Sequence, residues 1–274
     1  MSRPNRKSIP SPRSAPKAPA KVPGAVPSAR LRAQTRKVFE ALVDGGGTLI
    51  DTASSYGKAE EIIGEDVAEL KLRDRVFIAT KMEAENAKEG KAEFDASLRK
   101  LRTDHVDLMM LHNVKKADQS LAYLRDWQAQ KLTRYVGISS TFSRDFPAVE
   151  AVIKREKPDF VELNYSLNDR EVEARLLPAC ADAGAAVLTA LPFGRNLLFR
   201  AVKGKEVPEW AKEFDATTWG QFFLKFLLGH PAVTAVIPGT TKAEHMADNL
   251  AAGRGRLPDE AQRKKMVQFL NELG

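Results

Sequence analysis

The sequence predicts an α/β protein built as a (β/α)8 barrel, or TIM barrel, whose first strand is missing or degenerate. Two observations support this prediction. Short apolar runs rich in strand-forming residues alternate with segments of helical periodicity, and the first three runs end in Asp51, Lys81 and His112. Alternation of this kind implies a parallel sheet. In a parallel barrel the active site lies at the carboxyl ends of the strands, where these three residues fall.

The predicted elements follow one another from Arg32 to the C-terminus. The strand-like runs are 48–51, 76–80, 106–111, 135–139, 160–165, 185–190 and 233–237. Helical spacing of apolar residues fills the intervals; the first helix stops at Gly45-Gly46-Gly47, a single helix covers 171–183, and the last barrel helix is 243–251. Each unit spans roughly 25–35 residues, as βα units do. A doubly wound sheet is the alternative, but no strand is followed by Gly-x-Gly-x-x-Gly.

The first 31 residues read as a basic, proline-rich tail ahead of a barrel domain at 32–274. Residues 1–39 hold ten Lys or Arg and no Asp or Glu, so subtracting ten from the chain's +7 leaves −3 for the rest. Residues 1–28 hold seven prolines and show no apolar periodicity. Such a segment buries too little surface to offset its ordering entropy, so we expect it to be extended and disordered.

Composition argues against several classes of partner. The positive charge lies in a tail that has almost no aromatic residues, which disfavours nucleic acid. No apolar run is long enough to cross a bilayer, and the single Cys180 fits a reducing, cytoplasmic compartment. With four histidines, and only His112 at a strand end, we expect no metal site. The sequence indicates no oligomeric state.

Five strings in order carry a resemblance to a known family. They read IDTASSYGKAEEIIG, VFIATK, LRKLRTDHVDLMMLH, YVGISS and VIPGTTKAEHMADN, and they run from about Arg36 to the C-terminus. Together they resemble the aldo-keto reductases, and Asp51, Tyr56, Lys81 and His112 resemble that family's catalytic tetrad. The family usually opens with a β-hairpin and a first strand. The stretch Ser8–Leu31 occupies their place without their pattern.

The tetrad suits reduction of a carbonyl by hydride, which needs an acid at the carbonyl oxygen. Tyrosine, with a pKa of about 10, donates poorly at neutral pH, and a neighbouring ammonium lowers that pKa. We expect Lys81 to do this for Tyr56, Asp51 to hold Lys81, and His112 to orient the carbonyl or share the proton. Taken singly, a tyrosine after a strand is usually a packed rim residue, a lysine at a strand end is usually solvated, and a histidine after an apolar run is often a core group.

The resemblance also implies a cofactor site for NADP, favoured over NAD. The nicotinamide carboxamide would meet Ser139, Ser140 and Glu162, where the family usually has Ser, Asn and Gln. A loop over the pyrophosphate would hold Pro192, Phe193, Gly194 and Asn196; the alternative is an ordinary glycine turn. The ring that usually stacks on the nicotinamide falls near Ala190, so this contact is either missing or supplied by another residue such as Phe193. The adenosine 2′-phosphate would lie against Gly239, Thr240, Thr241, Lys242, His245 and Asn249, which open a helix.

The predicted function is therefore NADP-linked reduction of a small aldehyde or ketone, with Tyr56 as general acid. The alternative is a catalytically impaired or inert cofactor-binding barrel that lacks its first strand. Seven strands would leave two unpaired edges, and one of them carries Asp51. If Ser8–Leu31 cannot supply a strand, we therefore expect the site to be loosened on the side of Asp51 and Tyr56.

Overall fold

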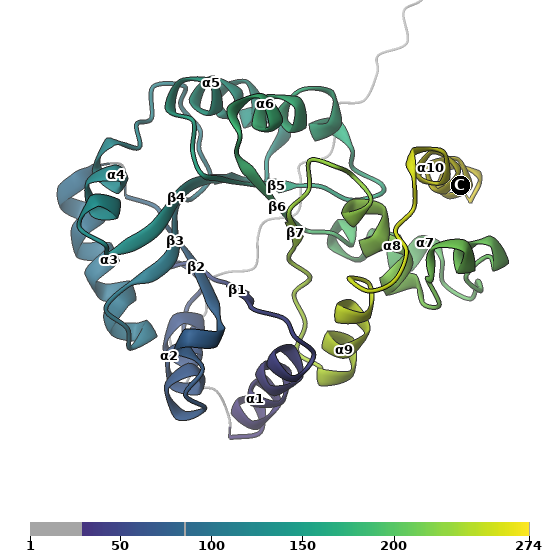
Figure 1. Cartoon of the computed structure of the whole chain (residues 1–274), viewed down its shortest axis with the longest axis horizontal. Helices are drawn as coiled ribbons and strands as arrows, with labels where there is room; N and C mark the ends of the chain where they lie inside the picture. Colours follow the sequence, from purple (N-terminus) through teal and green to yellow (C-terminus); the bar gives the residue numbers. More distant parts are fainter. Residues whose placement is uncertain (1–28, 85, 274) are drawn as a thin grey trace, which may run out of the picture.

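The computed structural model describes residues 29–84 and 86–273, and these form a curved parallel sheet surrounded by helices (Figure 1). The strands pair in sequence order, so the alternation predicted from the sequence is confirmed. Their bounds are β1 Leu49–Asp51, β2 Phe77–Met82, β3 Val106–Leu111, β4 Thr133–Ser140, β5 Phe160–Asn164, β6 Ala186–Ala190 and β7 Ala235–Val236.

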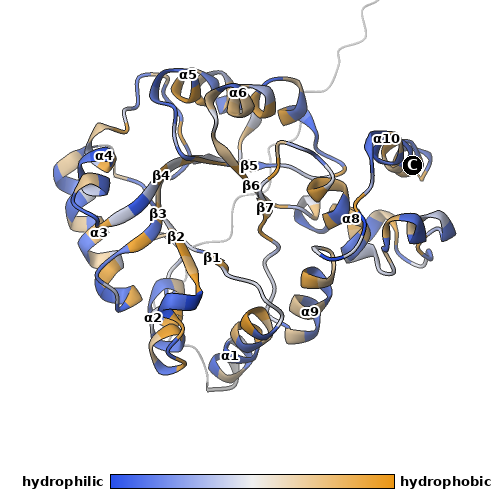
Figure 2. Ribbon diagram, viewed as in Figure 1, coloured by the Kyte–Doolittle hydropathy of each residue, from blue (hydrophilic) through white to orange (hydrophobic). Residues whose placement is uncertain are grey.

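Most of the helices lie around the outside of the strands and turn apolar faces toward them, while the last helix lies away from the sheet (Figures 1 and 2). Their bounds are α1 Ala29–Asp44, α2 Ala59–Glu69, α3 Ala87–Leu101, α4 Ala122–Ala129, α5 Phe146–Glu156, α6 Leu176–Ala183, α7 Leu197–Ala201, α8 Trp219–Leu228, α9 Ala243–Ala251 and α10 Glu260–Glu272. Helix α1 begins three residues before the expected boundary at Arg32. Residues 1–28, where the tail and any first strand were expected, lie outside the described residues. None of the described helices is both long and apolar enough to be a membrane-spanning segment.

Strand side chains alternate between the inside of the curved sheet and the helices outside. On the inside, the rings of Phe77, Tyr135 and Phe160 contact one another near the amino ends of their strands. Further along, a small buried cluster holds Ala79, Leu108, Met110 and Leu188. Apolar side chains therefore fill the interior up to the level at which charged residues begin.

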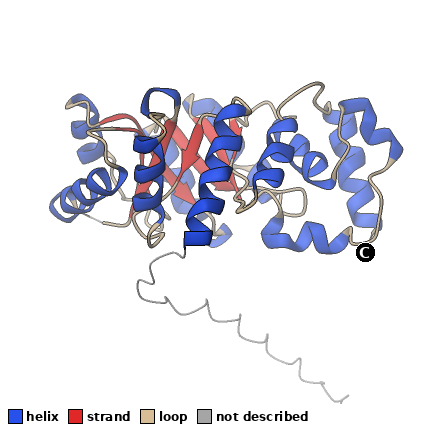
Figure 3. Ribbon diagram, turned by 90° about the horizontal axis from the view of Figure 1, so that it is seen from below, coloured by secondary structure: helices blue, strands red, loops and turns tan. Residues whose placement is uncertain are grey.

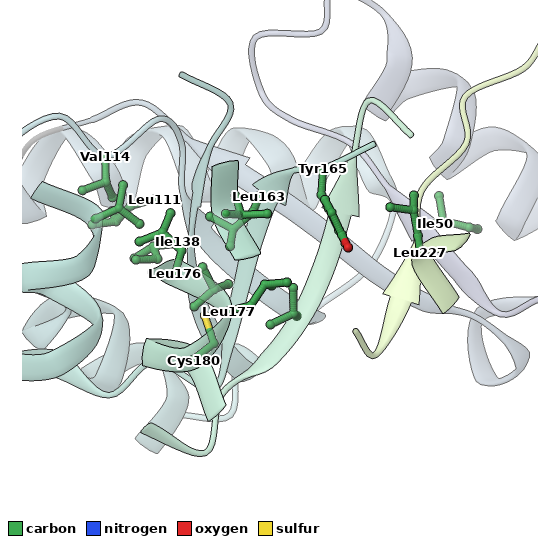
Figure 4. Close-up of a cluster of buried hydrophobic side chains, with 14 of the residues drawn as sticks. Ile50, Leu111, Val114, Ile138, Leu163, Tyr165, Leu176, Leu177, Cys180 and Leu227 are labelled. Atoms are coloured by element: carbon green, nitrogen blue, oxygen red, sulfur yellow. The ribbon is translucent and has the colours of Figure 1, made fainter. Parts of the chain in front are cut away.

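A larger core lies between the sheet and the helices (Figure 4). The strands contribute Ile50, Leu111, Ile138 and Leu163, and α6 contributes Leu176, Leu177 and Cys180. Burial raises the pKa of the Cys180 thiol to about 12, so this cysteine is part of the packing.

The sheet stays open between β1 and β7, which do not pair within the described part of the chain. A cavity of about 320 Å³ lies at this opening, lined by Leu49, Ala235 and Ile237 and by residues of α1 and α9. Beside the opening α1 packs against α9, and the Arg254 guanidinium donates a hydrogen bond to Gly45 O at 2.8 Å. Among the residues that the structure describes, helices rather than a strand bridge the two ends of the sheet.

Three elements differ from the prediction. The last strand shrinks from 233–237 to β7, because only β6 offers it partners. The helix expected over 171–183 breaks at Arg175, whose φ of −137° is not helical, into a 3-10 turn and α6. Helix α10 was not predicted. It begins in a capping box between Asp259 and Gln262 and lies at the far end of the molecule (Figure 3).

Candidate active site

The carboxyl ends of β1 and β2 bring Asp51 and Lys81 into a buried ion pair. Lys81 Nζ lies 2.7 and 2.6 Å from the two carboxylate oxygens of Asp51 and 3.2 Å from Thr52 O. The Lys81 side chain is 0% exposed. A third group completes this cluster, since Glu162 Oε2 on β5 lies 3.0 Å from the same ammonium.

Tyr56 lies above the ion pair on the loop that follows β1. The loop is held by Ser54 N, which donates to Lys81 O at 3.1 Å, and by Tyr56 N, which donates to Ala53 O at 3.0 Å. Lys81 Nζ is 5.5 Å from the centre of the Tyr56 ring, and Tyr56 as a residue is 47% exposed. The tyrosine therefore stands between a buried charge and solvent.

His112 meets the edge of the Tyr56 ring, with ring centres 5.7 Å apart. Its backbone N donates to Met82 O at 2.8 Å, which places it one residue beyond the last β2–β3 register pair, Met82 and Leu111. Its Nδ1 lies 3.5 Å from both Ser55 Oγ and Glu83 Oε1. The structure thus gathers Asp51, Tyr56, Lys81 and His112 in one place, as their positions at strand ends predicted.

Burial and the shared charge of Lys81 set the protonation of this cluster. Burial lowers the pKa of His112 and the Lys81 charge lowers it further, so its ring is neutral at pH 7. Burial also raises the pKa of Asp51 and lifts that of Glu162 to about 8. For Lys81 burial acts to lower the pKa, but Glu162 and Asp51 more than offset it, so its pKa lies above the usual value.

Lys81 acts to lower the pKa of Tyr56, as expected, but the net pKa of this hydroxyl is raised. Burial raises the pKa of Tyr56, and this outweighs the lowering effect of Lys81. Asp51 and Glu162 add to the rise, because their negative charge opposes the phenolate. The ammonium is present as predicted, but two carboxyl groups share its charge.

The residues expected at the nicotinamide carboxamide divide between two faces of the sheet. Ser139 is in register with Glu162, so the two lie on the inner face. Ser140 is in register with Leu163, which belongs to the outer, helix-facing core, so Ser140 does not join them. Ser139 Oγ donates to Leu111 O at 3.4 Å, while Glu162 Oε2 is buried without a hydrogen bond.

A separate cavity of about 480 Å³ collects six of the other predicted cofactor residues. It is lined by Phe193, Asn196, Gly239, Thr240, His245 and Asn249, together with Phe199, Thr218, Trp219, Gly220 and Asp248. Its lining combines aromatic rings with polar groups, which suits a nucleotide. The other four predicted residues, Pro192, Gly194, Thr241 and Lys242, are not part of this lining.

For two of these four residues, Gly194 and Lys242, the structure shows a local feature that bears on the prediction. Gly194 has a φ of +54°, and a Cβ there would lie 2.2 Å from Asn168 Oδ1, so its turn requires glycine. Lys242 is exposed and directly precedes α9. Both positions fit the predicted loops, and neither observation tests whether Gly194 or Lys242 binds a cofactor.

The sequence prediction missed Asp248, which brings a carboxylate into the cavity expected to hold a phosphate. Thr218 Oγ1 donates to it at 2.8 Å and Gln221 Nε2 at 2.7 Å, so it ties α9 to α8. Its position three residues after His245, one helical turn on, was the available signal. Among the described residues, no group of three or more His, Cys, Asp or Glu side chains is arranged to hold a metal ion.

Comparisons with known proteins agree with this arrangement. Methylglyoxal reductase YeaE of Escherichia coli is 30% identical over 217 residues, covering 76% of this chain and 75% of that protein. Methylglyoxal reductase DkgB of Salmonella typhi is 29% identical over 218 residues, covering 76% and 77%. The crystal structure of an aldo/keto reductase from Klebsiella pneumoniae, in complex with NADP and acetate, matches with a TM-score of 0.75 and 25% identity, covering 88% of this chain and 87% of that one. The sequence model of the Aldo/keto reductase family matches residues 28–265, and on this match the chain belongs to the aldo/keto reductase family.

Proposed function

We propose that this protein reduces small aldehydes or ketones with NADPH, using Tyr56 as the general acid. The observation that carries the proposal is the buried Asp51–Lys81 ion pair beneath Tyr56, with His112 against the same ring. Two similar proteins are methylglyoxal reductases, so methylglyoxal is the first substrate to test.

The side chains divide the work of one proton transfer. The Tyr56 hydroxyl donates its proton to the carbonyl oxygen, and the nearby Lys81 ammonium stabilises the phenolate that remains. Asp51 keeps Lys81 charged and fixed through its two hydrogen bonds. His112, neutral at pH 7 because burial lowers its pKa, hydrogen-bonds the carbonyl without adding charge. Bound NADPH supplies the hydride.

The residues present fit a nicotinamide dinucleotide. Glu162 Oε2 is a buried oxygen without a hydrogen bond, 3.0 Å from Lys81 Nζ, where a carboxamide would find a partner. The cavity lined by Phe193, Trp219 and His245 has room and aromatic walls for the adenosine end. NADP rather than NAD is supported by the Klebsiella pneumoniae structure, which holds NADP.

The substitution Tyr56→Phe tests the proposal, because it removes only the acidic proton. Turnover of methylglyoxal, followed by NADPH oxidation, should fall about 10²–10⁴-fold, while the NADPH Kd from fluorescence titration stays unchanged. Tyr135→Phe is the matched control, since Tyr135 lies inside the barrel near the amino ends of the strands. Turnover by Tyr56→Phe within threefold of wild type would contradict the assignment. NADPH binding without turnover in the wild type would favour the inert barrel.

A further inference from the structure

Glu162 has an unusual position for a carboxyl group. Its side chain is 4% exposed inside the barrel, with Oε2 3.0 Å from Lys81 Nζ. The ammonium has three N–H groups, and its hydrogen bonds go to the two oxygens of Asp51 and to Thr52 O. Glu162 Oε2 is therefore next to the charge and left without a hydrogen bond.

The charges around Glu162 do not balance if both carboxyl groups ionise. The titratable groups that face it are Asp51 from β1, Lys81 from β2 and Tyr56 from the loop after β1. Its register partners on β4 and β6, Ser139 and Leu188, carry no charge. One ammonium neutralises one carboxylate, and a second buried negative charge is costly. One of the two carboxyl groups should therefore hold a proton.

The hydrogen bonds show which group that is. Asp51 accepts from Lys81 with both oxygens, an arrangement that favours its ionised form. Glu162 Oε2 has no hydrogen bond of its own and its side chain is equally buried, so the proton belongs on Glu162. In agreement, burial raises the pKa of Glu162 to about 8.

We propose that Glu162 is a positioning residue that holds a proton at neutral pH and, on losing it, changes the buried site from neutral to negative. A protonated carboxyl group offers one donor and one acceptor, as the amide of Gln does at this position in most aldo-keto reductases. Unlike Gln, it can titrate. The site therefore has two charge states within the physiological range.

This proposal deepens the proposed function by giving the cofactor preference a pH dependence. When the substrate carbonyl is hydrogen-bonded to Tyr56, hydride transfer to its carbon requires the nicotinamide ring to lie against this site. The oxidised ring is positively charged and the reduced ring is not. Ionised Glu162 therefore favours the oxidised cofactor, and protonated Glu162 removes that preference.

The proton itself can be tested on the protein without cofactor, through Glu162→Gln. A glutamic acid titrates near pH 4.3 when unfolded, and the pKa of Glu162 in the folded protein is about 8. Between these values the folded wild type holds a proton that the unfolded chain has lost. Its stability therefore falls as pH rises through this window, and the Gln variant escapes that loss.

The measurement is the Tm of Glu162→Gln minus the Tm of wild type, from about pH 5 to pH 8. We expect this difference to rise continuously with pH. Glu60→Gln is the control, because Glu60 is an equally buried carboxylate that accepts from Thr80 Oγ1 at 2.8 Å and has no contact with Lys81. A difference that stays constant with pH, or one that Glu60→Gln reproduces, would overturn the proposal.

The second measurement is the ratio of the Kd for NADP⁺ to the Kd for NADPH, by titration calorimetry between pH 6 and pH 9. In the wild type this ratio should fall about tenfold as pH rises, because NADP⁺ comes to bind more tightly relative to NADPH. In Glu162→Gln the ratio should stay constant. An equal shift in both proteins would overturn the link to the cofactor. If neither cofactor binds, the proposed function fails, while the Tm result still decides whether Glu162 holds the proton.

Discussion

At the scale of single residues, Lys81 determines the charge of the site. Its ammonium is fully buried, holds Asp51 through two hydrogen bonds and lies 3.0 Å from Glu162. Removing this charge would leave two buried carboxyl groups without a counter-ion, an arrangement that costs several kcal/mol. Lys81 is therefore needed for the folded arrangement of the site as well as for the proposed chemistry.

Lys242 gives a prediction at the same scale. It precedes α9, whose residues His245 and Asn249 line the larger cavity, and it is exposed. Lys242→Ala should weaken NADPH by about 1 kcal/mol, or roughly fivefold in Kd, because an exposed pair contributes little more. NADH should bind unchanged. The control is Lys88→Ala on α3, on the other side of the barrel. Equal weakening of both cofactors would place the 2′-phosphate elsewhere.

The grouping of Asp51, Tyr56, Lys81 and His112 was predictable, since three follow the ends of neighbouring strands and Tyr56 lies on the loop after the first. The sequence did not predict that Asp51 and Glu162 both lie against the Lys81 ammonium. Glu162 was expected to face a cofactor, and only the register of β5 and the direction of its side chain show that it reaches the ammonium. Asp248 was missed because its charge contradicted the phosphate site that the flanking residues suggested.

At the scale of elements, periodicity predicted most of the strands well. Strands β2 to β6 are hydrogen-bonded on both sides and lie close to their predicted ranges. Strand β7 pairs only with β6 and keeps only Ala235–Val236 of its apolar run. Helix α10 was missed because its buried side is narrow, with Met266 the one buried residue of that helix. Strand β1 also pairs on one side only, yet it matches its predicted range 48–51 within one residue, so the loss is specific to β7.

The contact between α2 and α3 yields a prediction about an element. A Cβ on Gly64 of α2 would lie 2.2 Å from Lys100 O and 2.6 Å from the carbonyl carbon of Leu101, both backbone atoms that cannot rotate away. Gly64→Ala should therefore destabilise the protein by about 1–3 kcal/mol. Gly90→Ala on α3 is the control, since its nearest contact is a Trp127 ring atom at 3.3 Å.

The two variants should separate clearly in thermal melts. For a chain of this size each kcal/mol shifts Tm by roughly 2–4 °C. Gly90→Ala should change stability by less than about 1 kcal/mol, because the gain in helix propensity offsets the tight contact. Similar Tm values for both variants would mean that α2 can move away from α3 at little cost.

At the scale of the whole molecule, the described residues 29–84 and 86–273 form a sheet that is open between β1 and β7, unlike a closed eight-stranded barrel. Closure removes sheet edges, and an open edge leaves backbone donors and acceptors without partners from the sheet. Strand β1, which lies on one side of the opening, carries Asp51. Motion at this edge acts directly on the ion pair beneath Tyr56, and displacement of a catalytic group by about 1 Å can cost on the order of 10²-fold in rate.

Adding a first strand tests whether the opening beside β1 limits stability and activity. Replacing residues 1–28 with a hairpin and first strand of the aldo-keto reductase type should raise Tm by at least about 4 °C. Turnover should rise too, because β1 would be held on both sides. The control carries two prolines in the added strand, which remove its hydrogen bonds. No gain over that control would show that the opening does not limit stability or activity.

The packing of α1 against α9 also bears on how the protein is made. The hydrogen bond from Arg254 to Gly45 O joins residues 209 positions apart. At a synthesis rate of about 5–20 residues per second, roughly 10–40 s separate the two residues on the ribosome. Throughout that interval the surface of α1 that α9 later covers has no partner from the described part of the chain. Because of the order of synthesis, the surface of α1 stays uncovered until α9 has been made. A nascent-chain chaperone would therefore help this protein most by binding that surface.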